Sequence, residues 1–190
     1  MPESPRELPT LTTERLLLRP FTLADAGDIR RLAGAKEIAA TMLYMPHPYE
    51  EGLAERWIAS LPDGWAAGRE LHLAITTGAT GELIGAAGLS DLDTPHRRGE
   101  LGYWVGVPYW GRGYCTEAAR RLVRFAFDNL GLHRVVAHHF TRNPASGRVL
   151  AKIGMTHEGT LRQHVLKNGV FEDREAWGIL ATDPAAKPGG

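Results

Sequence analysis

The sequence predicts a single α/β domain built around a mixed β-sheet. The 190 residues are 43% hydrophobic and 23% charged, a composition that can bury the core of one domain. Short runs rich in β-branched residues lie between amphipathic runs, so both strands and helices are expected. Their order is strand, two helices, three strands, helix, strand, helix and two strands. That order differs from the strict alternation of a doubly wound dinucleotide-binding fold.

The first part of the chain predicts one strand and two helices, over residues 14–21, 23–32 and 49–61. Pro20 ends the strand because proline lacks a backbone N–H, and Thr22 is a residue type that caps helix N-termini. A loop over 41–50, with prolines on both sides of His47, joins the helices. The turn sequence PDG at 62–64 is expected to end the second helix.

The rest of the chain predicts strands over residues 71–76, 82–90, 98–107, 133–140, 160–166 and 171–180. A long amphipathic helix is expected after Gly113, and a short helix is expected before Gly154, a residue type common at helix C-termini. The sequence KNG at 167–169 predicts a hairpin turn between the last two strands. We expect flexible segments at 1–10 and 182–190 on either side of a domain of residues 11–181.

The charge balance and the cysteine content argue against several classes of protein. Twenty-two basic and 22 acidic residues give a formal net charge of zero and a pI of about 7.1, whereas nucleic-acid and membrane-surface binders need a strong basic field. With one cysteine, Cys115, no internal disulfide can form. The polar, proline-broken start and the lack of a long apolar run favour a cytoplasmic protein. We therefore expect neither a nucleic acid nor a membrane as a partner.

The stretch WGRGYCTEA, residues 110–118, is typical of a loop that binds an anion at the start of a helix. Gly111 and Gly113 let the main chain approach a ligand, Arg112 supplies a cation, and Thr116 can cap the helix or donate a hydrogen bond. The first N–H groups of a helix are unpaired and lie at the positive end of its dipole, so the stretch predicts a phosphate or pyrophosphate site. The P-loop and dinucleotide motifs do not fit, since no lysine follows Gly113 and Thr116 stands in place of a third glycine. A glycine-rich helix start without a ligand is the alternative.

Three ordered motifs resemble the GCN5-related N-acetyltransferases (GNAT), in particular the branch that acetylates the N-termini of ribosomal proteins. Residues 109–118 read YWGRGYCTEA, close to the YWGxGYxTEA of that branch. Residues 143–154 (NPASGRVLAKIG) and 45–49 (MPHPY) carry the second and third motifs, whereas Trp110 and Cys115 depart from the pattern of the wider family. The resemblance implies a single-domain fold. Its mixed, mostly antiparallel sheet would be splayed between two central parallel strands and flanked by about four helices.

The resemblance also implies that acetyl-CoA is the cosubstrate and lies in the gap between the parallel strands. Backbone amides near Val105 and Val107 would hold the pantetheine arm and the thioester carbonyl. The amides of residues 112–116 would bind the pyrophosphate, and Asn143 would bond the arm or the incoming amine. The expected acetyl-CoA-binding residues are Val105, Val107, Arg112, Gly113, Tyr114, Cys115, Thr116, Asn143 and Ser146.

Three residues are candidates for proton transfer. Glu100, on the strand that would border the gap, is the first candidate for the general base, and a surface glutamate paired with a neighbouring arginine is the alternative. His164 is the second candidate because an imidazole titrates near neutral pH, although a hairpin histidine is more often merely exposed. Many relatives serve the leaving thiolate with a tyrosine where this chain has Leu150, so the resemblance assigns that role to Ser146 instead. A serine that only caps the helix is the alternative.

The sequence leaves the acceptor open. An α-amine with a pKa of about 8 is roughly ten per cent neutral at pH 7, far more than a lysine amine, so a protein N-terminus needs only a weak base. The other hypotheses are a small acceptor, such as a polyamine, amino acid or antibiotic, and a non-catalytic acyl-CoA-binding module. His47 and Tyr49 are expected acceptor contacts because binding residues concentrate in loops. No metal is expected, since His138 and His139 point to opposite faces of a strand. A homodimer is a further open alternative.

Overall fold

The computed structural model describes residues 7–186, which fold into one α/β domain. The α-helices of this range are α1 (Ala26–Ala33), α2 (Lys36–Thr41), α3 (Leu53–Ala66), α4 (Tyr114–Asp128) and α5 (Pro144–Lys152). Its strands are β1 (Leu11–Thr12), β2 (Leu16–Arg19), β3 (Leu71–Thr77), β4 (Leu83–Asp93), β5 (Arg98–Val105), β6 (Arg134–Phe140), β7 (Thr156–Lys167) and β8 (Val170–Leu180). The flexible ends expected from the sequence fall partly on residues 1–6 and 187–190, which lie outside the described residues. No helix within 7–186 is long and apolar enough to cross a membrane.

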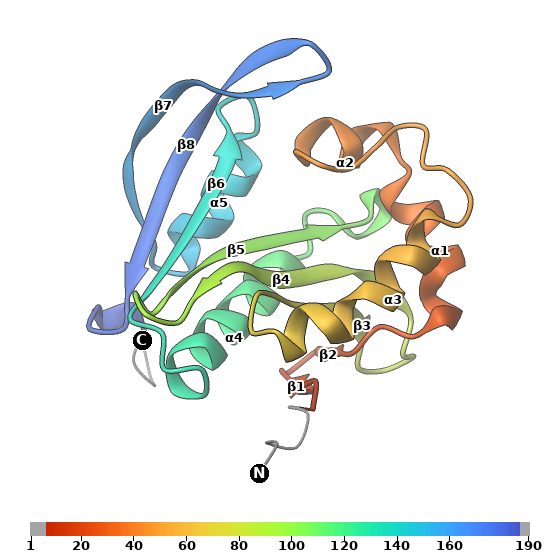
Figure 1. The fold of residues 1–190 in the computed structure, drawn as a ribbon, viewed down its shortest axis with the longest axis horizontal. Coiled ribbons are helices and arrows are strands. Elements are labelled where there is room, and N and C mark those ends of the chain that lie inside the picture. Colours follow the sequence, from red (N-terminus) through yellow and green to blue (C-terminus); the bar gives the residue numbers. More distant parts are fainter. Residues whose placement is uncertain (1–6, 187–190) are drawn as a thin grey trace.

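The strands of the described range form one sheet in the order β1-β2-β3-β4-β5-β6-β8-β7. Neighbouring strands are antiparallel except β5 and β6, which run parallel. These two pair only over residues 98–100 and 134–136, and beyond that point they diverge (Figure 1). β5 continues along β4 as far as Val105, and β6 continues along β8 as far as Phe140. The splayed, mostly antiparallel sheet predicted from the sequence is confirmed.

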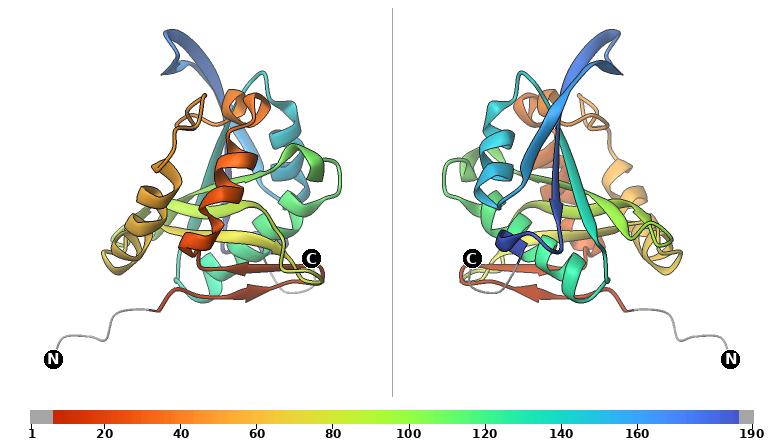
Figure 2. Two further views of the ribbon diagram at one scale, coloured as in Figure 1. Left: turned by 90° about the vertical axis from the view of Figure 1, so that its right-hand side faces the viewer. Right: turned by 90° about the vertical axis from the view of Figure 1, so that its left-hand side faces the viewer.

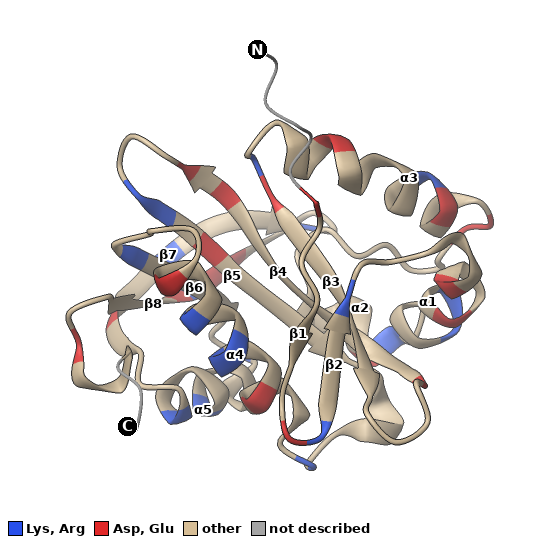
Figure 3. Cartoon of the chain, turned by 90° about the horizontal axis from the view of Figure 1, so that it is seen from below, with Lys and Arg blue, Asp and Glu red and all other residues tan. Residues whose placement is uncertain are grey.

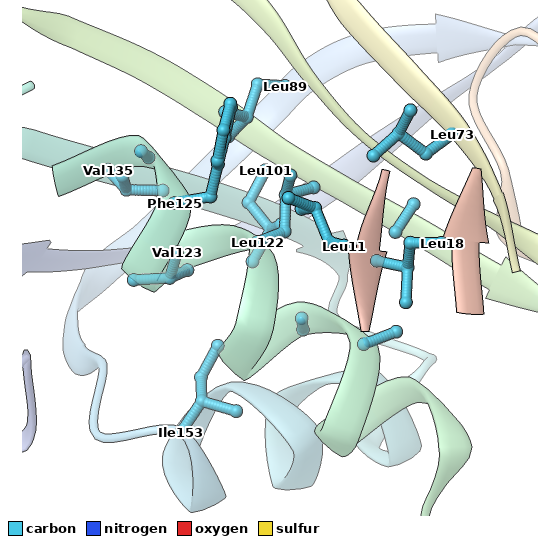
Figure 4. Packing of buried hydrophobic residues seen from close by; sticks show 14 of the residues in the cluster. Leu11, Leu18, Leu73, Leu89, Leu101, Leu122, Val123, Phe125, Val135 and Ile153 are labelled. Atoms are coloured by element: carbon cyan, nitrogen blue, oxygen red, sulfur yellow. The ribbon is translucent and has the colours of Figure 1, made fainter. Parts of the chain in front are cut away.

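Helices cover both faces of the sheet, and each face has its own hydrophobic core (Figure 2). On one face, Leu122 and Phe125 of α4 pack against Leu101 of β5 and Val135 of β6 (Figure 4). On the other face, α1, α2 and α3 pack around Trp104. Burial of these apolar side chains is the main favourable contribution to folding, and it holds the sheet between two helical layers.

The alternation of side chains along β5 decides which face of the sheet each residue serves. Leu101 and Val105 belong to the core under α4, so Tyr103 between them points to the same face. Trp104 belongs to the core under α1 and α3, so Glu100 points to that face. The gap between β5 and β6 therefore opens to two sides, one bordered by α4 and α5 and the other by α1 and α3.

The prediction that the helix α3 ends at 62–64 is wrong, because the helix continues to Ala66. A proline inside a helix removes one backbone hydrogen bond, but the additional turn buries Trp65, which is 2% exposed. Trp65 Nε1 also donates to the carbonyl of Glu7 at 3.1 Å. Tertiary burial outweighs the local signal here. The turn that follows the helix contains Gly68, which has a φ of 66°.

Other boundaries also differ from the sequence prediction. The helix α2 and the strand β1 are additional elements, and both are too short to produce a periodic pattern. β5 is shorter than predicted, because residues 107–109 form a 3₁₀ turn. The hairpin turn at 167–169 is confirmed, with φ values of 50° at Asn168 and 80° at Gly169, as a two-residue type I′ turn requires.

Lys167 ties the β7–β8 hairpin to the end of α2. Its Nζ donates to the carbonyls of Met42 at 2.6 Å and Leu43 at 3.2 Å, where a cation also stabilises the negative end of the helix dipole. Lys167 is 8% exposed, and burial lowers the pKa of its amine. The hairpin and α2 are thereby held together over the open end of the gap (Figure 1).

Candidate active site

The loop before α4 presents backbone N–H groups at the start of the helix. Gly111 and Gly113 have φ values of 74° and 79°, and Gly113 is the N-cap of α4. Within the described residues, the N–H groups of 111–116 have no acceptor, and Glu117 is the first residue whose N–H returns to the loop, at 3.1 Å from the Gly113 carbonyl. These donors lie at the positive end of the helix dipole, so the loop fits a phosphate group.

Arg15 brings a second cation to this loop. Its Nη1 donates to the carbonyl of Arg112 at 3.0 Å, and its Nε donates to the carboxylate of Glu117 at 2.7 Å. The guanidinium also lies over the ring of Tyr114, 4.9 Å from the ring centroid. Sequence reasoning missed Arg15, because its place beside Arg112 depends on the pairing of β2 within the sheet.

Backbone groups of β5 face the open part of the gap. The N–H of Gly106 donates to Ile84 on β4 at 2.8 Å, so the polar groups of the preceding residue, Val105, point away from β4. Trp110 Nε1 donates to the Val105 carbonyl at 2.8 Å, which leaves the Val105 N–H directed toward the gap. Val107 begins the 3₁₀ turn, and its N–H has no backbone acceptor in the described part of the chain.

On the α4 side of the gap, Tyr103 and Ser146 form a hydrogen-bonded pair. The Tyr103 hydroxyl lies 3.0 Å from Ser146 Oγ and 3.1 Å from the Ser146 carbonyl oxygen. The Ser146 side chain therefore contacts β5, and the start of α5 has no side-chain capping hydrogen bond. Burial raises the pKa of Tyr103 above its usual value of 10, more than the hydrogen bond with Ser146 lowers it, so the phenol stays protonated.

The neighbours of this pair complete the α4 side of the gap. Burial raises the pKa of the Cys115 thiol to about 12, so this thiol is a packing group and not a nucleophile. Leu150, at the position where many relatives have a tyrosine, is 1% exposed in the core. Asn143 is the half-buried N-cap residue of α5, and its side-chain amide makes no capping hydrogen bond.

On the opposite face of the sheet, Glu100 forms a hydrogen-bonded triad with His138 and Arg174. Glu100 Oε1 lies 2.9 Å from His138 Nδ1 and 3.1 Å from Arg174 Nη2. Burial alone would raise the pKa of Glu100, but the hydrogen bonds from His138 and Arg174, together with the positive charge of Arg174, outweigh it and hold the pKa below its ordinary value of 4.5. Glu100 is thus an ionised carboxylate. The neighbouring Arg98 bonds Asp93 instead.

A bulge in β7 turns His164 toward this triad. The register between β7 and β8 shifts within residues 161–165, and Gln163 has a φ of 48°. The carboxylate of Asp173 accepts the N–H of Gln163 at 2.7 Å, which holds the bulge in place. The exposed His164 ring lies 6.0 Å from the His138 ring, measured between centroids. The structure therefore brings this sequence-predicted residue next to the triad.

The two expected acceptor contacts lie on the loop before α3. His47 is exposed, and its Nδ1 lies 3.0 Å from the Gly34 carbonyl. Tyr49 packs against the core under α1 and α3, and burial raises the pKa of its phenol. Their described contacts are thus with the helical layer and not with the triad, and their role as acceptor contacts stays a prediction.

A pocket opens beside the triad on the α1–α3 side. Its charged and titratable lining residues are Arg69, Asp91, Asp93, Arg98, Glu100 and His138. Gly102, the next residue along this face of β5, leaves open space, because a Cβ added there would have no other atom within 4 Å. An amine could approach the gap over Gly102 without meeting a side chain at that position.

Sequence reasoning missed Tyr103, His138 and Arg174. Tyr103 and Arg174 stand within ordinary strand patterns that carry no sign of their partners. The sequence feature that could have identified His138 is its neighbour His139, because adjacent strand residues point to opposite faces of the sheet. His139 is 7% exposed and accepts a hydrogen bond from Trp177 Nε1 at 3.1 Å, whereas His138 borders the pocket. No group of three or more His, Cys, Asp or Glu side chains in the described range is arranged to hold a metal ion.

Comparison with known proteins gives consistent matches over most of the chain. A family model described as an acetyltransferase (GNAT) domain matches residues 15–156. YoaA of Bacillus subtilis, described as an uncharacterized N-acetyltransferase, is 34% identical over 173 residues, which cover 90% of this chain and 97% of that protein. The ribosomal protein uS5-alanine N-acetyltransferase of Escherichia coli is 28% identical over 189 residues, which cover 91% of each chain. The structure of Mycobacterium smegmatis RimJ in complex with CoA-disulfide superimposes with a TM-score of 0.80 at 25% identity, covering 96% of this chain and 92% of that one.

Proposed function

The chain belongs to the GNAT family of acetyltransferases and is an acetyl-CoA-dependent N-acetyltransferase, and on this basis we propose that it acetylates the free α-amine of a protein N-terminus. One observation carries the choice of acceptor: the charges around the pocket are balanced. The carboxylates of Asp91, Asp93 and Glu100 lie among the guanidinium groups of Arg69, Arg98 and Arg174.

A balanced pocket favours an acceptor with one amine over a polyamine. A polyamine keeps at least one positive charge after its reacting amine has been neutralised, and that charge needs an unpaired carboxylate. Glu100 lies two residues before Gly102 on the same face of β5, and its charge is offset by Arg174. The similarity to a ribosomal protein N-terminal acetyltransferase of Escherichia coli, at 28% identity, supports the same choice.

The chemistry of the α-amine fits a site with a weak base. An N-terminal amine titrates near pH 8, so about a tenth of it is neutral at pH 7, whereas a lysine amine titrates near pH 10.4. Glu100 is ionised, and its Oε1 already accepts hydrogen bonds from two partners, so this carboxylate is a weak base. An acceptor that is already partly neutral places the smallest demand on this site.

We propose that the loop before α4 holds the pyrophosphate of acetyl-CoA through the N–H groups of 112–116. Arg112 provides positive charge there, Arg15 lies beside it in an ion pair with Glu117, and α4 and α5 carry further Lys and Arg residues (Figure 3). The N–H groups of Val105 and Val107 would hold the pantetheine arm and the thioester carbonyl, and such donors stabilise the oxygen that becomes negative during transfer. Asn143 would bond the arm or the amine.

In this proposal the two faces of the sheet serve the two halves of the reaction. Ser146 would donate a hydrogen bond or a proton to the leaving thiolate from the α4 side, where Tyr103 holds its hydroxyl. Glu100 and His164 would serve the amine from the α1–α3 side. The gap between β5 and β6 is the place where the amine and the thioester would meet. A homodimer and a cytoplasmic location stay predictions of the sequence.

The proposed acceptor is tested by measuring CoA thiol release with matched amines. The panel is a short peptide with a free N-terminal alanine and an internal lysine, the same peptide with a blocked N-terminus, and spermidine. We expect kcat/KM for the free peptide to exceed both other values at least about tenfold. Its α-amine is partly neutral at pH 7, unlike the lysine amine of the blocked peptide, and it is a single amine, unlike those of spermidine. A higher value for spermidine or for the blocked peptide would refute the acceptor. Binding of acetyl-CoA without turnover of any amine would instead favour a non-catalytic module.

A further inference from the structure

We propose that His138 is the catalytic residue that takes the proton from the acceptor amine, and that Glu100 is its positioning residue. The inference rests on amine acetylation as proposed above and assigns the base to a residue outside the GNAT sequence motifs. It follows from the hydrogen bonds of the triad, from the place of His138 in the sheet, and from the open space over Gly102 next to it.

The hydrogen bonds of the triad decide which ring nitrogen of His138 is free. Glu100 is ionised, so its Oε1 accepts a hydrogen bond and the facing atom, His138 Nδ1 at 2.9 Å, must carry the proton. In a neutral imidazole the other nitrogen, Nε2, then has the lone pair. No described residue is hydrogen-bonded to His138 Nε2, and the side chain is 18% exposed at the pocket. Nε2 is therefore an available proton acceptor.

The position of His138 in β6 puts it at the start of the gap. Val136 is the last residue of β6 that pairs with β5, opposite Glu100, and His138 is the next residue on the same face of the strand. The corresponding place on β5 is Gly102, where a Cβ would have no other atom within 4 Å. An amine that approaches the gap through the open space over Gly102 passes beside the imidazole.

The two earlier candidates are less suited to take this proton directly. Oε1 of Glu100 already receives hydrogen bonds from His138 and Arg174, and the low pKa makes it a poor proton acceptor. His164 is exposed, and its ring centroid is 6.0 Å from that of His138, on the hairpin side. A neutral imidazole oriented by a carboxylate is a more effective base near pH 7 than an ionised carboxylate in an ion pair.

The neutral amine nitrogen attacks the thioester carbonyl carbon, a C–N bond forms, and the nitrogen becomes positively charged. His138 Nε2 takes one proton from that nitrogen and later releases it to solvent. The electron pair that the attack placed on the carbonyl oxygen then re-forms the C=O bond, the C–S bond breaks, and the thiolate takes one proton through Ser146, whose hydroxyl regains a proton from solvent. The products are the N-acetylated amine and CoA thiol, and no oxidant or metal enters the balance.

Several charged groups face His138 and contribute to any pH dependence. Glu100 and Arg174 approach it from β5 and β8, and His164 approaches it from β7. The groups that share the pocket with it are Arg69, Asp91, Asp93 and Arg98. Histidine is the side-chain type that ordinarily changes charge between pH 5 and 8. A change of the pH profile in that range can therefore be assigned by substituting one histidine at a time.

The test uses the full-length enzyme and compares His138→Asn with wild type. An asparagine amide can still donate to Glu100 from about the place of Nδ1, but it has no counterpart of Nε2. We expect kcat to fall about 100-fold with the free N-terminal alanine peptide. If the reaction requires both a neutral amine and a neutral imidazole, log kcat/KM of wild type should rise with pH with a slope near 2 at low pH. In His138→Asn only the amine has to lose a proton, so the slope should be near 1. Acetyl-CoA binding and the melting temperature should stay close to wild type.

Three further variants sharpen the test. His138→Gln removes the base in a second way, in case the asparagine variant does not fold. His133→Asn removes an exposed histidine just before β6 and should keep wild-type turnover and slope. Glu100→Gln keeps the shape of the positioning residue without its charge, so it should move the acid limb of the profile to lower pH, which a purely structural contact would not do.

Two results would overturn the inference. One is turnover within about threefold of wild type in folded His138→Asn and His138→Gln, and the other is a slope near 2 that persists in these variants but disappears in His164→Asn. The acceptor proposal fails separately, if spermidine is the better substrate. In that case the same profiles measured with spermidine still decide the role of His138.

Discussion

Removing the hydroxyl of Tyr103 tests whether Ser146 has to be held in place for turnover. Tyr103→Phe keeps the ring that packs between β5 and α4 and deletes the one oxygen that lies 3.0 Å from Ser146 Oγ and 3.1 Å from its carbonyl. A hydrogen bond of this kind contributes about 1 kcal/mol to stability. For a chain of this size that corresponds to a fall of about 3 °C in the melting temperature.

The effect on turnover follows from the freedom that the Ser146 side chain gains. A serine side chain has three staggered rotamers, so a released hydroxyl occupies the required one for about a third of the time. We expect kcat to fall about three- to tenfold in Tyr103→Phe. Ser146→Ala removes the proposed donor altogether and should cost more, at least about tenfold. Burial keeps Tyr103 protonated by raising its pKa, so the pH profile of Tyr103→Phe should match that of wild type.

The assay is CoA thiol release at saturating acetyl-CoA for both single variants and the double variant. If Tyr103 acts only through Ser146, then the double variant should be no slower than Ser146→Ala, within about twofold. Multiplicative losses in the double variant would refute the reasoning, because they would mean that the two residues act independently. Equal kcat in wild type and both single variants would remove the α4 side of the gap from the proposed mechanism.

The remaining predictions concern the open space over Gly102, the loop before α4 and the stability of the enzyme in acid. Gly102→Val should leave the melting temperature within about 2 °C, since its Cβ has no other atom within 4 Å, but should lower kcat/KM for the peptide at least about tenfold by filling the approach to the gap. Gly113→Ala should cost about 1 kcal/mol of stability at a φ of 79° and should weaken acetyl-CoA binding in calorimetry. Burial alone would raise the pKa of Asp25, but hydrogen bonds from Arg19 and Thr22 hold it below its ordinary value. The ionised carboxylate therefore stabilises the folded state at neutral pH, and this contribution is lost as the pH falls through the acid range below about 4. Asp25→Asn should destabilise the enzyme at pH 7 by about 2 kcal/mol and flatten its loss of stability in acid, as measured by denaturant unfolding.

Matched controls separate these effects from general damage. Gly102→Ala should slow the peptide less than Gly102→Val, and an unchanged rate in both variants would mean that the amine takes another path. Gly131→Ala carries similar backbone strain at a φ of 65° beyond the other end of α4 and should leave acetyl-CoA affinity unchanged. Equal weakening in Gly113→Ala and Gly131→Ala would contradict the proposed pyrophosphate loop. An acid transition of the same steepness in Asp25→Asn and wild type would contradict the role given to this carboxylate.

Local sequence signals predicted the elements whose cause is local. The glycines at 111 and 113 adopt positive φ at the start of α4, and Asn168 and Gly169 form the hairpin turn, because these residue types determine backbone conformation within a few residues. The motifs around them also led to the GNAT family, which the comparisons confirm. Local signals fail where a contact with a distant part of the chain determines where an element ends. α3 continues through Pro62 because Trp65 is buried in a core that the helix sequence does not reveal.

The sequence by itself predicted the strands and helices and an anion site at the start of α4, and the resemblance of its short motifs to the GNAT family predicted the acetyl-donor chemistry. The tertiary structure alone decided the partners of Glu100, which come from His138, 38 positions away, and from Arg174, 74 positions away. Tyr103 and Ser146, 43 positions apart, meet for the same reason. In each case β5 supplies one partner, while the other lies on β6, β8 or α5, and only the splayed pairing of β5 with β6 sets which side chains face each other across the gap. Hydrogen bonds act over about 3 Å, so their partners are determined by the fold and not by distance along the chain.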